Sequence, residues 1–298
     1  MKAFVTGGTG FIGSYIVKGL VEKGHSVVIY ARNPEKVSGF LNNDSISFVQ
    51  GTMADTKNFA EGVKGCDAVI HVALAWGNTP HEMLENETLP SVRLFEAAAE
   101  AGVGKIIYTS SIAAFGTAPN TDSGFVKPYD NYGATKAAAE AYLMAVGGNR
   151  KTKVNVVRPG YTFGNPVVEG AFMYTDLKIK NMVKKALAGE SMEFDKNDGT
   201  QFIWAGDLAK IFIALAESDL DRGYYTGVSA EFREWGQVAQ MAVDVTGSKS
   251  QVIFHDTGRK APEGLPIDVS QIKEAFGFSF SADAHMVDHL KYLAELYR

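Results

Sequence analysis

Short apolar runs alternate with amphipathic stretches through the first 160 residues. The apolar runs predict strands at 2–6, 26–30, 46–49, 67–72, 105–109 and 153–157. They are apolar at successive positions, which is typical of parallel strands that helices cover on both faces. Between them, helices are predicted at 11–22, 56–63, 81–101 and 131–146, and Pro90 indicates a kink or a broken start in the third. This alternation predicts an α/β fold built on a doubly wound parallel sheet.

The turn after the first predicted strand is rich in glycine. Residues 6–13 read Thr-Gly-Gly-Thr-Gly-Phe-Ile-Gly. Glycines permit a tight turn and let backbone N–H groups approach a pyrophosphate, and the helix that follows presents unpaired N–H groups at its start. The strand before and the amphipathic helix after distinguish this turn from an ordinary connection. We therefore expect a dinucleotide cofactor to be bound by Gly7, Gly10, Phe11, Ile12 and Gly13.

The end of the second predicted strand bears on the choice of cofactor. NAD sites usually carry Asp or Glu here, which accepts a hydrogen bond from the ribose 2′-OH. This chain has no carboxylate between His25 and Pro34 and has Arg32 instead. A guanidinium suits a 2′-phosphate, so Arg32 favours NADP. NAD remains possible if Arg32 only stacks on the adenine.

Tyr132 and Lys136 are spaced so that a helix places both on one face. A tyrosine has an ordinary pKa of about 10. A nearby ammonium favours the phenolate, which makes Tyr132 a candidate general acid/base for the interconversion of a carbonyl and an alcohol. Lys136 is also expected to hold the nicotinamide ribose. Ser110 and Ser111 follow the strand at 105–109, where a hydroxyl can donate to the reacting oxygen.

Several stretches together resemble a known family. They are TGGTGFIG (6–13), DAVIHVA (67–73), YTSSIAAFG (108–116), YGATK (132–136) and RPGYTFG (158–164). With them the chain resembles the extended short-chain dehydrogenase/reductases of the NAD(P)-dependent epimerase/dehydratase family. The resemblance implies that Ser111 is the catalytic serine, that the backbone of Ala73 and Leu74 lines the cofactor cleft, and that Pro159 lies near the nicotinamide.

The chain departs from this family at three positions. Gly51-Thr52 stands where many members have Gly-Asp for the adenine amine, so Thr52 or Asp55 is expected to serve. Tyr161 and Thr200 stand where nucleotide-sugar members usually have Asn and Arg. In those members the Asn and Arg hold the sugar and the diphosphate. Their absence disfavours a diphosphate substrate here, unless Arg259 and Lys260 bind the diphosphate instead.

After residue 160 the pattern becomes looser. The pattern over residues 201–226 predicts that the chain returns to the main sheet there. We expect a dinucleotide-binding domain over residues 1–165, completed by 201–226. A smaller C-terminal substrate-binding lobe is expected from residues 166–200 and 227–298.

These features predict an NAD(P)-dependent oxidoreductase that transfers a hydride between a nicotinamide and a carbonyl or alcohol substrate. Tyr132 would move the proton and Ser111 would steady the oxygen. One alternative is a nucleotide-sugar epimerase or dehydratase, although Ile112 and Ala113 occupy the place of the acidic pair that dehydratases use. Another is a catalytically silent NADP-sensing regulator, against which the intact set of Ser111, Tyr132 and Lys136 argues.

Composition limits the remaining partners. The 298 residues carry a net charge of −5, which gives no general attraction to nucleic acid or anionic membranes. Cys66 is the single cysteine, and no signal peptide precedes the first strand, so a cytoplasmic protein without disulfides is expected. No metal site is expected, since only His285 and His289 have helical ligand spacing, on a predicted surface helix. Alanines around the helices at 81–101 and 131–146 favour a homodimer, the arrangement common in related enzymes.

Overall fold

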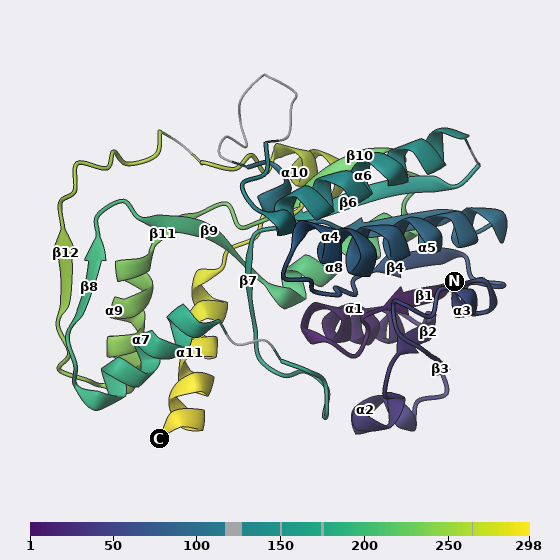
Figure 1. Ribbon diagram of the computed structural model, residues 1–298. Coiled ribbons are helices and arrows are strands. Elements are labelled where there is room, and N and C mark those ends of the chain that lie inside the picture. The colour runs from purple at the N-terminus through teal and green to yellow at the C-terminus, as the bar shows by residue number, and fades with distance from the viewer. Residues whose placement is uncertain (117–126, 150, 174–175, 264) are drawn as a thin grey trace. The chain divides into compact units, whose positions relative to one another are not determined.

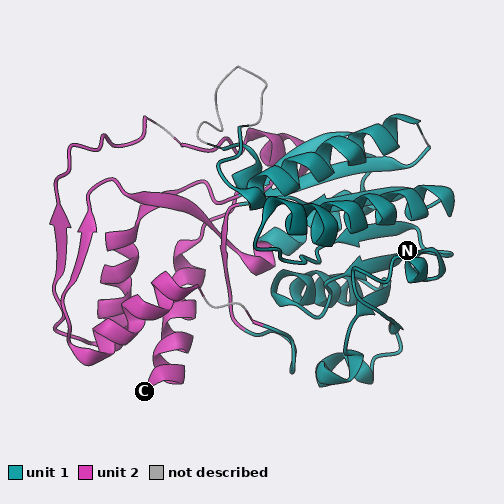
Figure 2. Cartoon of the chain, viewed as in Figure 1, with its two compact units in different colours: residues 1–159, 166–172, 208–227 teal, residues 160–165, 173–207, 228–298 magenta. Residues whose placement is uncertain are grey.

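The computed structural model describes residues 1–116, 127–149, 151–173, 176–263 and 265–298. Figure 1 labels its elements. The chain divides into two compact units, coloured separately in Figure 2. Unit 1 contains residues 1–159, 166–172 and 208–227, and unit 2 contains residues 160–165, 173–207 and 228–298. Each unit has its own sheet structure and its own buried core.

Unit 1 is built on a parallel sheet. Its strand order is β10-β6-β5-β4-β1-β2-β3. The strands are β1 (Lys2–Thr6), β2 (Ser26–Ala31), β3 (Ile46–Gln50), β4 (Ala68–His71), β5 (Lys105–Thr109), β6 (Lys153–Pro159) and β10 (Gly223–Gly227). The order reverses between β1 and β4, which confirms the doubly wound α/β fold. Ligands of such sheets bind outside the carboxyl ends of the strands at this reversal.

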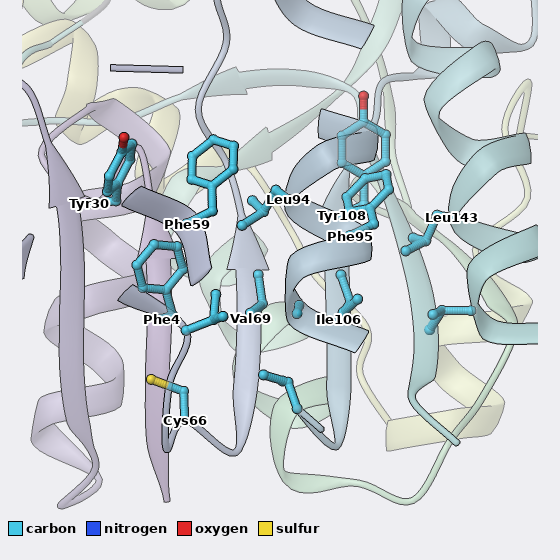
Figure 3. Packing of buried hydrophobic residues seen from close by; sticks show 14 of the residues in the cluster. Phe4, Tyr30, Phe59, Cys66, Val69, Leu94, Phe95, Ile106, Tyr108 and Leu143 are labelled. Carbon is cyan, nitrogen blue, oxygen red and sulfur yellow. The ribbon is translucent and has the colours of Figure 1, made fainter. Parts of the chain in front are cut away.

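Helices cover both faces of the sheet. The helices of this part are α1 (Phe11–Glu22), α2 (Ser38–Leu41), α3 (Lys57–Gly62), α4 (Pro80–Met83), α5 (Leu89–Glu100), α6 (Asn131–Asn149) and α8 (Ala205–Glu217). On one face, side chains of α3, α5 and α6 pack on strand residues (Figure 3); the labelled members include Phe4, Phe59, Leu94, Phe95, Tyr108 and Leu143. Elsewhere α1 and α8 approach closely, because a Cβ on Gly19 would lie 2.6 Å from Ile213 Cδ1.

The segment predicted as one helix at 81–101 is interrupted. Helix α4 is followed by a π-helical turn, η2 (Leu84–Thr88), and then by α5, with Pro90 in the first turn of α5. The backbone stays helical through this region, and the irregularity expected at Pro90 takes the form of the π-helical turn just before it. This turn places Glu87 in a fully buried position.

Unit 2 contains two small sheets and the helices that pack around them. The three-stranded sheet has the order β11-β9-β7, and β12 pairs with β8. The elements of unit 2 are β7 (Tyr161–Phe163), β8 (Met192–Asp195), β9 (Gly199–Trp204), β11 (Phe232–Glu234), β12 (Val252–His255), α7 (Leu177–Ala188), α9 (Trp235–Thr246), α10 (Ser270–Phe276) and α11 (Asp283–Tyr297). Side chains of α7, α9 and α11 share one core with Phe163 and Phe202.

One sequence expectation about the main sheet is wrong. Residues 201–203 belong to β9, which pairs with β7 and β11 instead of returning to the sheet of unit 1. From residues 201–226, only 208–226 lie in unit 1, where they supply most of α8 and strand β10. An apolar pattern identifies a strand but not its partner, so the pattern alone could not assign β9 to a sheet. Residues 166–172 lie in unit 1, where Phe172 N–H donates to the Thr9 carbonyl.

Candidate cofactor and catalytic site

The parallel strands of unit 1 bring several sequence-predicted site residues to one edge of the sheet. Gly7 directly follows β1, Arg32 follows β2 and Pro159 ends β6. The register pairs Thr6 with His71 and His71 with Tyr108, so β1, β4 and β5 end at the same level. The residues that follow β4 and β5, which include Ala73 and Ser111, therefore lie at the same carboxyl edge.

The glycine turn is tightly packed against the segment that follows β4. Gly7 has a φ of +70°, and a Cβ at this position would lie 2.6 Å from the backbone nitrogen of Ala73. A Cβ on Gly13 would collide with the Gly7 carbonyl oxygen, which fixes how closely α1 approaches the turn. Both positions require glycine, and the turn brings Gly7, Gly13 and Ala73 together.

The start of α1 fits an anionic group. Gly10 is its N-cap residue and provides no side-chain hydrogen bond, and the first turn contains no acidic residue. The first N–H groups of a helix have no intrahelical partner, and the helix dipole is positive at this end. A Cβ on Gly10 would meet only the Gly7 carbonyl oxygen, at 3.2 Å, so one side of the turn is open. These residues fit the pyrophosphate of a dinucleotide.

The segments after β2 and β3 form the neighbouring part of this edge. Arg32 is exposed, and its backbone carbonyl accepts a hydrogen bond from Gln50. The backbone N–H and the hydroxyl of Thr52 both donate to Asp55 Oδ2, each at 2.8 Å. These hydrogen bonds lower the pKa of the Asp55 carboxyl group. Thr52 and Asp55 thus form one closed turn, which Tyr30 braces by donating to the Thr52 carbonyl.

Tyr132 and Lys136 lie on α6 as the spacing predicts. The Lys136 Nζ is 5.8 Å from the centre of the Tyr132 ring. Lys136 is only 3% exposed, and its Nζ lies 2.7 Å from Oε1 of the fully buried Glu87. Although burial alone would lower the pKa of Lys136, the Glu87 carboxylate raises it above the ordinary value. The residue pattern did not single out Glu87, since a glutamate in a helix is usually solvent-exposed.

The two serines after β5 have different surroundings. Ser110 is buried and donates to Glu140, whose carboxylate also accepts from Arg158 Nε at 2.8 Å. Ser111 is partly exposed, and its Oγ accepts from the Ala113 N–H at the start of the short helix η3 (Ile112–Ala114). That short helix packs tightly against α6, because a Cβ on Gly133 would collide with the Ala113 carbonyl oxygen. Among the described residues, the hydrogen bond given for Ser111 uses its Oγ as an acceptor and leaves its proton for another group, so the geometry favours Ser111 over Ser110 as a donor.

A buried chain of hydrogen bonds links the glycine turn to Glu87. The Ser91 hydroxyl donates to the Glu87 carbonyl at 2.6 Å, and His71 Nε2 is 2.9 Å from Ser91 Oγ. His71 Nδ1 lies 2.6 Å from the hydroxyl oxygen of Thr6. Because the Ser91 proton is already used, His71 must donate from Nε2 and accept at Nδ1, which assigns its neutral tautomer. Burial and the Lys136 charge lower the pKa of His71 to about 3, consistent with that assignment.

An exposed tryptophan lies beside Tyr132. Trp76 is 61% exposed, and its ring centre is 5.8 Å from that of Tyr132. Its loop is held by the π-helical turn η2, which follows it in the chain: the Trp76 carbonyl accepts from Asn86, and the Ala75 N–H donates to Glu87. Sequence reasoning missed Trp76, although an aromatic residue two positions after Leu74 was the available signal. Leu74 itself is largely exposed.

The two histidines of α11 have different surroundings. The helix has an exposed side, as expected for a surface helix, but His289 lies on its buried face with Met286 and Leu290 and hydrogen-bonds Asn165 at 2.7 Å. Burial lowers its pKa to about 4. His285 stacks on Trp204 instead. Within the described parts of the chain, no group of three His, Cys, Asp or Glu side chains is arranged to hold a metal ion.

A doubly wound parallel sheet with a glycine turn at its reversal point defines a dinucleotide-binding protein of the Rossmann type. Comparison with known families narrows this class. The chain belongs to the NAD dependent epimerase/dehydratase family, whose model matches residues 3–225. It is therefore an enzyme of the extended short-chain dehydrogenase/reductase type.

Individual relatives include both reductases and epimerases. Cinnamoyl-CoA reductase 2 of Medicago truncatula is 34% identical over 74% of this chain and 70% of its own length. An uncharacterized UDP-glucose epimerase of Bacillus subtilis is 22% identical over 100% of this chain and 99% of its own length. Among solved structures, the UDP-glucuronic acid 4-epimerase of Bacillus cereus in complex with NAD has a TM-score of 0.83 at 18% identity, with both chains covered completely. That structural likeness shows the fold.

In the parts of the chain that the structure describes, no helix combines the length and apolarity needed to cross a membrane.

Proposed function

We propose that this enzyme is an NADP-preferring reductase of aldehydes or ketones that also oxidises the corresponding alcohols. The observation that carries the proposal is Arg32, which lies exposed at the end of β2 where NAD enzymes usually have a carboxylate. The 34% identity to cinnamoyl-CoA reductase 2 of Medicago truncatula supports a reaction with net reduction of the substrate. Thr200 and Tyr161 add support, since they stand where nucleotide-sugar enzymes are expected to carry the groups that hold sugar and diphosphate.

In the proposed site, Gly7, Gly10, Phe11, Ile12 and Gly13 hold the pyrophosphate with backbone N–H groups and the start of α1. Arg32 binds the 2′-phosphate. Thr52 lies at the adenine, and the backbone of Ala73 and Leu74 lines the cleft. Pro159 and Lys136 hold the nicotinamide end, and the bound cofactor supplies or accepts the hydride.

The remaining steps belong to side chains of unit 1. Tyr132 donates its hydroxyl proton to the carbonyl oxygen during reduction, and its phenolate takes the proton back during oxidation. Ser111 donates a hydrogen bond to the same oxygen and stabilises its developing charge. Lys136 supplies a fixed positive charge near Tyr132, because its pairing with Glu87 keeps it protonated.

A second candidate is a nucleotide-sugar epimerase that uses NAD. It is favoured by the relative matched over 99% of its own length, which is named as an uncharacterized UDP-glucose epimerase. Arg259 is the candidate to bind a diphosphate, but its ion pair with Asp198 makes its guanidinium less available to a second anion.

The experiment that tests the proposal offers the enzyme NADPH or NADH with aromatic and aliphatic aldehydes, ketones and CoA thioesters. The absorbance of the reduced nicotinamide reports turnover. Trp76 exposes an aromatic ring beside Tyr132, so aromatic carbonyl compounds are expected to be the better substrates. In parallel, UDP-glucose and UDP-glucuronic acid are incubated with enzyme and NAD, and the sugars are analysed. Sugar conversion without consumption of the reduced cofactor would overturn the reductase proposal in favour of the epimerase, and binding without any turnover would favour a silent NADP sensor.

We also propose that this enzyme, which acts on a small-molecule substrate, forms a homodimer through the outer surfaces of η2, α5 and α6. Leu84, Leu89 and Tyr142 are large apolar side chains exposed on these elements. On α6, Ala134, Ala141 and Ala145 are exposed as well, and small side chains allow close helix packing. A two-fold pairing would bury the same surface of each copy.

A further inference from the structure

Glu87 is a buried carboxylate whose two oxygens have different tasks. Its Oε1 lies 2.7 Å from Lys136 Nζ, and its Oε2 accepts the backbone N–H of Ala75 at 2.8 Å. The residue has no exposed surface. An ionised carboxylate is costly to bury unless it is paired and hydrogen-bonded, and here both conditions are met. Glu87 therefore ties α6 to the loop that carries Trp76.

The backbone of Glu87 is anchored just as firmly. It lies in the π-helical turn η2, a rare conformation that is frequent at functional sites. Its carbonyl accepts from Ser91, which continues through His71 to Thr6, the residue before Gly7. The same residue thus connects the end of β1, the loop after β4 and the helix of Tyr132.

We propose that Glu87 is a positioning residue of the reaction: its carboxylate holds the Lys136 ammonium and the Ala75–Trp76 loop in the arrangement that Tyr132 requires. This inference rests on the roles proposed above for Tyr132 and Lys136. The charge of Glu87 is essential to it, because an amide of the same size could bond to Ala75 but could not stabilise a buried ammonium.

The groups around Lys136 show why the charge matters. Glu87 faces it from η2, Tyr108 from β5 and Tyr132 from α6, and His71 of β4 lies close enough to feel its charge. His71 is neutral, and burial raises the pKa of Tyr108 out of the range in which it ionises. Among the described residues, Glu87 is the carboxylate that pairs with Lys136. Without it, burial would lower the pKa of Lys136.

The test compares Glu87→Gln, which removes only the charge, with Glu87→Asp, which keeps it. Glu96→Gln is the control, because Glu96 is exposed on α5. Protein labelled with 13C at the lysine ε carbons is titrated by NMR, and the Lys136→Met variant assigns the signal. Lys136 is expected to stay protonated to above pH ~10.4, the ordinary value, in the unchanged protein, in Glu87→Asp and in the control. In Glu87→Gln the titration midpoint of Lys136 should lie below this ordinary lysine value. The proton affinity of Lys136 should then be at least about tenfold weaker than that of an ordinary lysine.

A second measurement separates positioning from packing. For the best carbonyl substrate, kcat of Glu87→Gln should fall on the order of 100-fold while KM stays within a few-fold, and Glu87→Asp should recover much of the loss. Lysine titration needs no substrate, so it remains readable even if the enzyme reduces no carbonyl compound. Unchanged titration of Lys136 in Glu87→Gln would overturn the inference.

A variant that does not fold is also informative. If Glu87→Gln is unfolded, the double variant Glu87→Gln/Lys136→Met removes both buried charges and is expected to fold again, because the unpaired ammonium is gone. A double variant that remains unfolded would show that Glu87 serves packing alone, which contradicts the proposal.

Discussion

At the scale of single residues, the main result is that the expected pair of Tyr132 and Lys136 is a group of three. Lys136 was expected to act on Tyr132 as a nearby ammonium, and the structure adds Glu87, which pairs with it in a buried position. The pair carries no net charge, so the field at Tyr132 is weaker than that of an isolated ammonium. The helical spacing predicted which residues share a face of α6, whereas Glu87 comes from a distant turn whose burial the local pattern does not reveal.

The choice of cofactor is also decided at a single residue. Arg32→Ala should weaken the binding of NADP about 10-fold or more and leave that of NAD within a few-fold, because the lost contact is to the 2′-phosphate. Dissociation constants of both cofactors, measured by calorimetry, check this. Lys36, which is exposed nearby, could supply part of the charge, so Arg32→Ala/Lys36→Ala is the stronger form of the test. Equal losses for NAD and NADP would show that Arg32 only stacks on the adenine.

At the scale of elements, strand and helix predictions succeeded where local pattern and chain order agree. The strands β1 to β6 follow runs of successive apolar residues, and their parallel order follows from the alternation of strand and helix. Strand β9 was placed in the wrong sheet, because periodicity carries no information about its partner. Helix α11 has one exposed side, as predicted for a surface helix, but the pattern did not show that His289 lies on the apolar side that packs in the core of unit 2.

The burial of His289 on α11 has a consequence for pH. Its pKa is lowered from 6.5 to about 4 in the folded protein, so the unfolded chain binds more protons between these values. The stabilisation from the neutral ring is therefore complete above about pH 6.5 and is lost as the pH falls toward 4. Urea unfolding at several pH values should show this decline. His289→Gln, which does not titrate, should have a smaller decline over the same range than the unchanged protein, and an equal decline in both would contradict the assignment.

At the scale of the whole molecule, the chain has two compact units, and the sequence-predicted cofactor and catalytic residues belong to unit 1. The sequence predicted two parts because the strand–helix alternation ends near residue 160, but it set the boundary at residue 165, whereas residues 160–165 lie in unit 2. It could not place the short segments that cross between the units, such as 166–172, since these have no periodic pattern.

Assembly is a property of the whole molecule as well. If the surfaces of η2, α5 and α6 pair two copies, sedimentation at micromolar concentration should give a dimer, and Tyr142→Glu should give a monomer because it buries a charge in the interface. Asn149→Glu, at the exposed end of α6, is the matched control and should remain dimeric. A monomer of the unchanged protein with full activity would rule the interface out.

The central claim is that Tyr132 moves the proton, and replacing its hydroxyl tests this most directly. Tyr132→Phe is measured with the best substrate of the carbonyl panel, with Tyr142→Phe on the same helix as the control. The account predicts that kcat of Tyr132→Phe falls about 100-fold to 10,000-fold while the dissociation constant of NADPH stays within a few-fold. The control should turn over normally. A Tyr132→Phe enzyme with nearly unchanged kcat would contradict the mechanism.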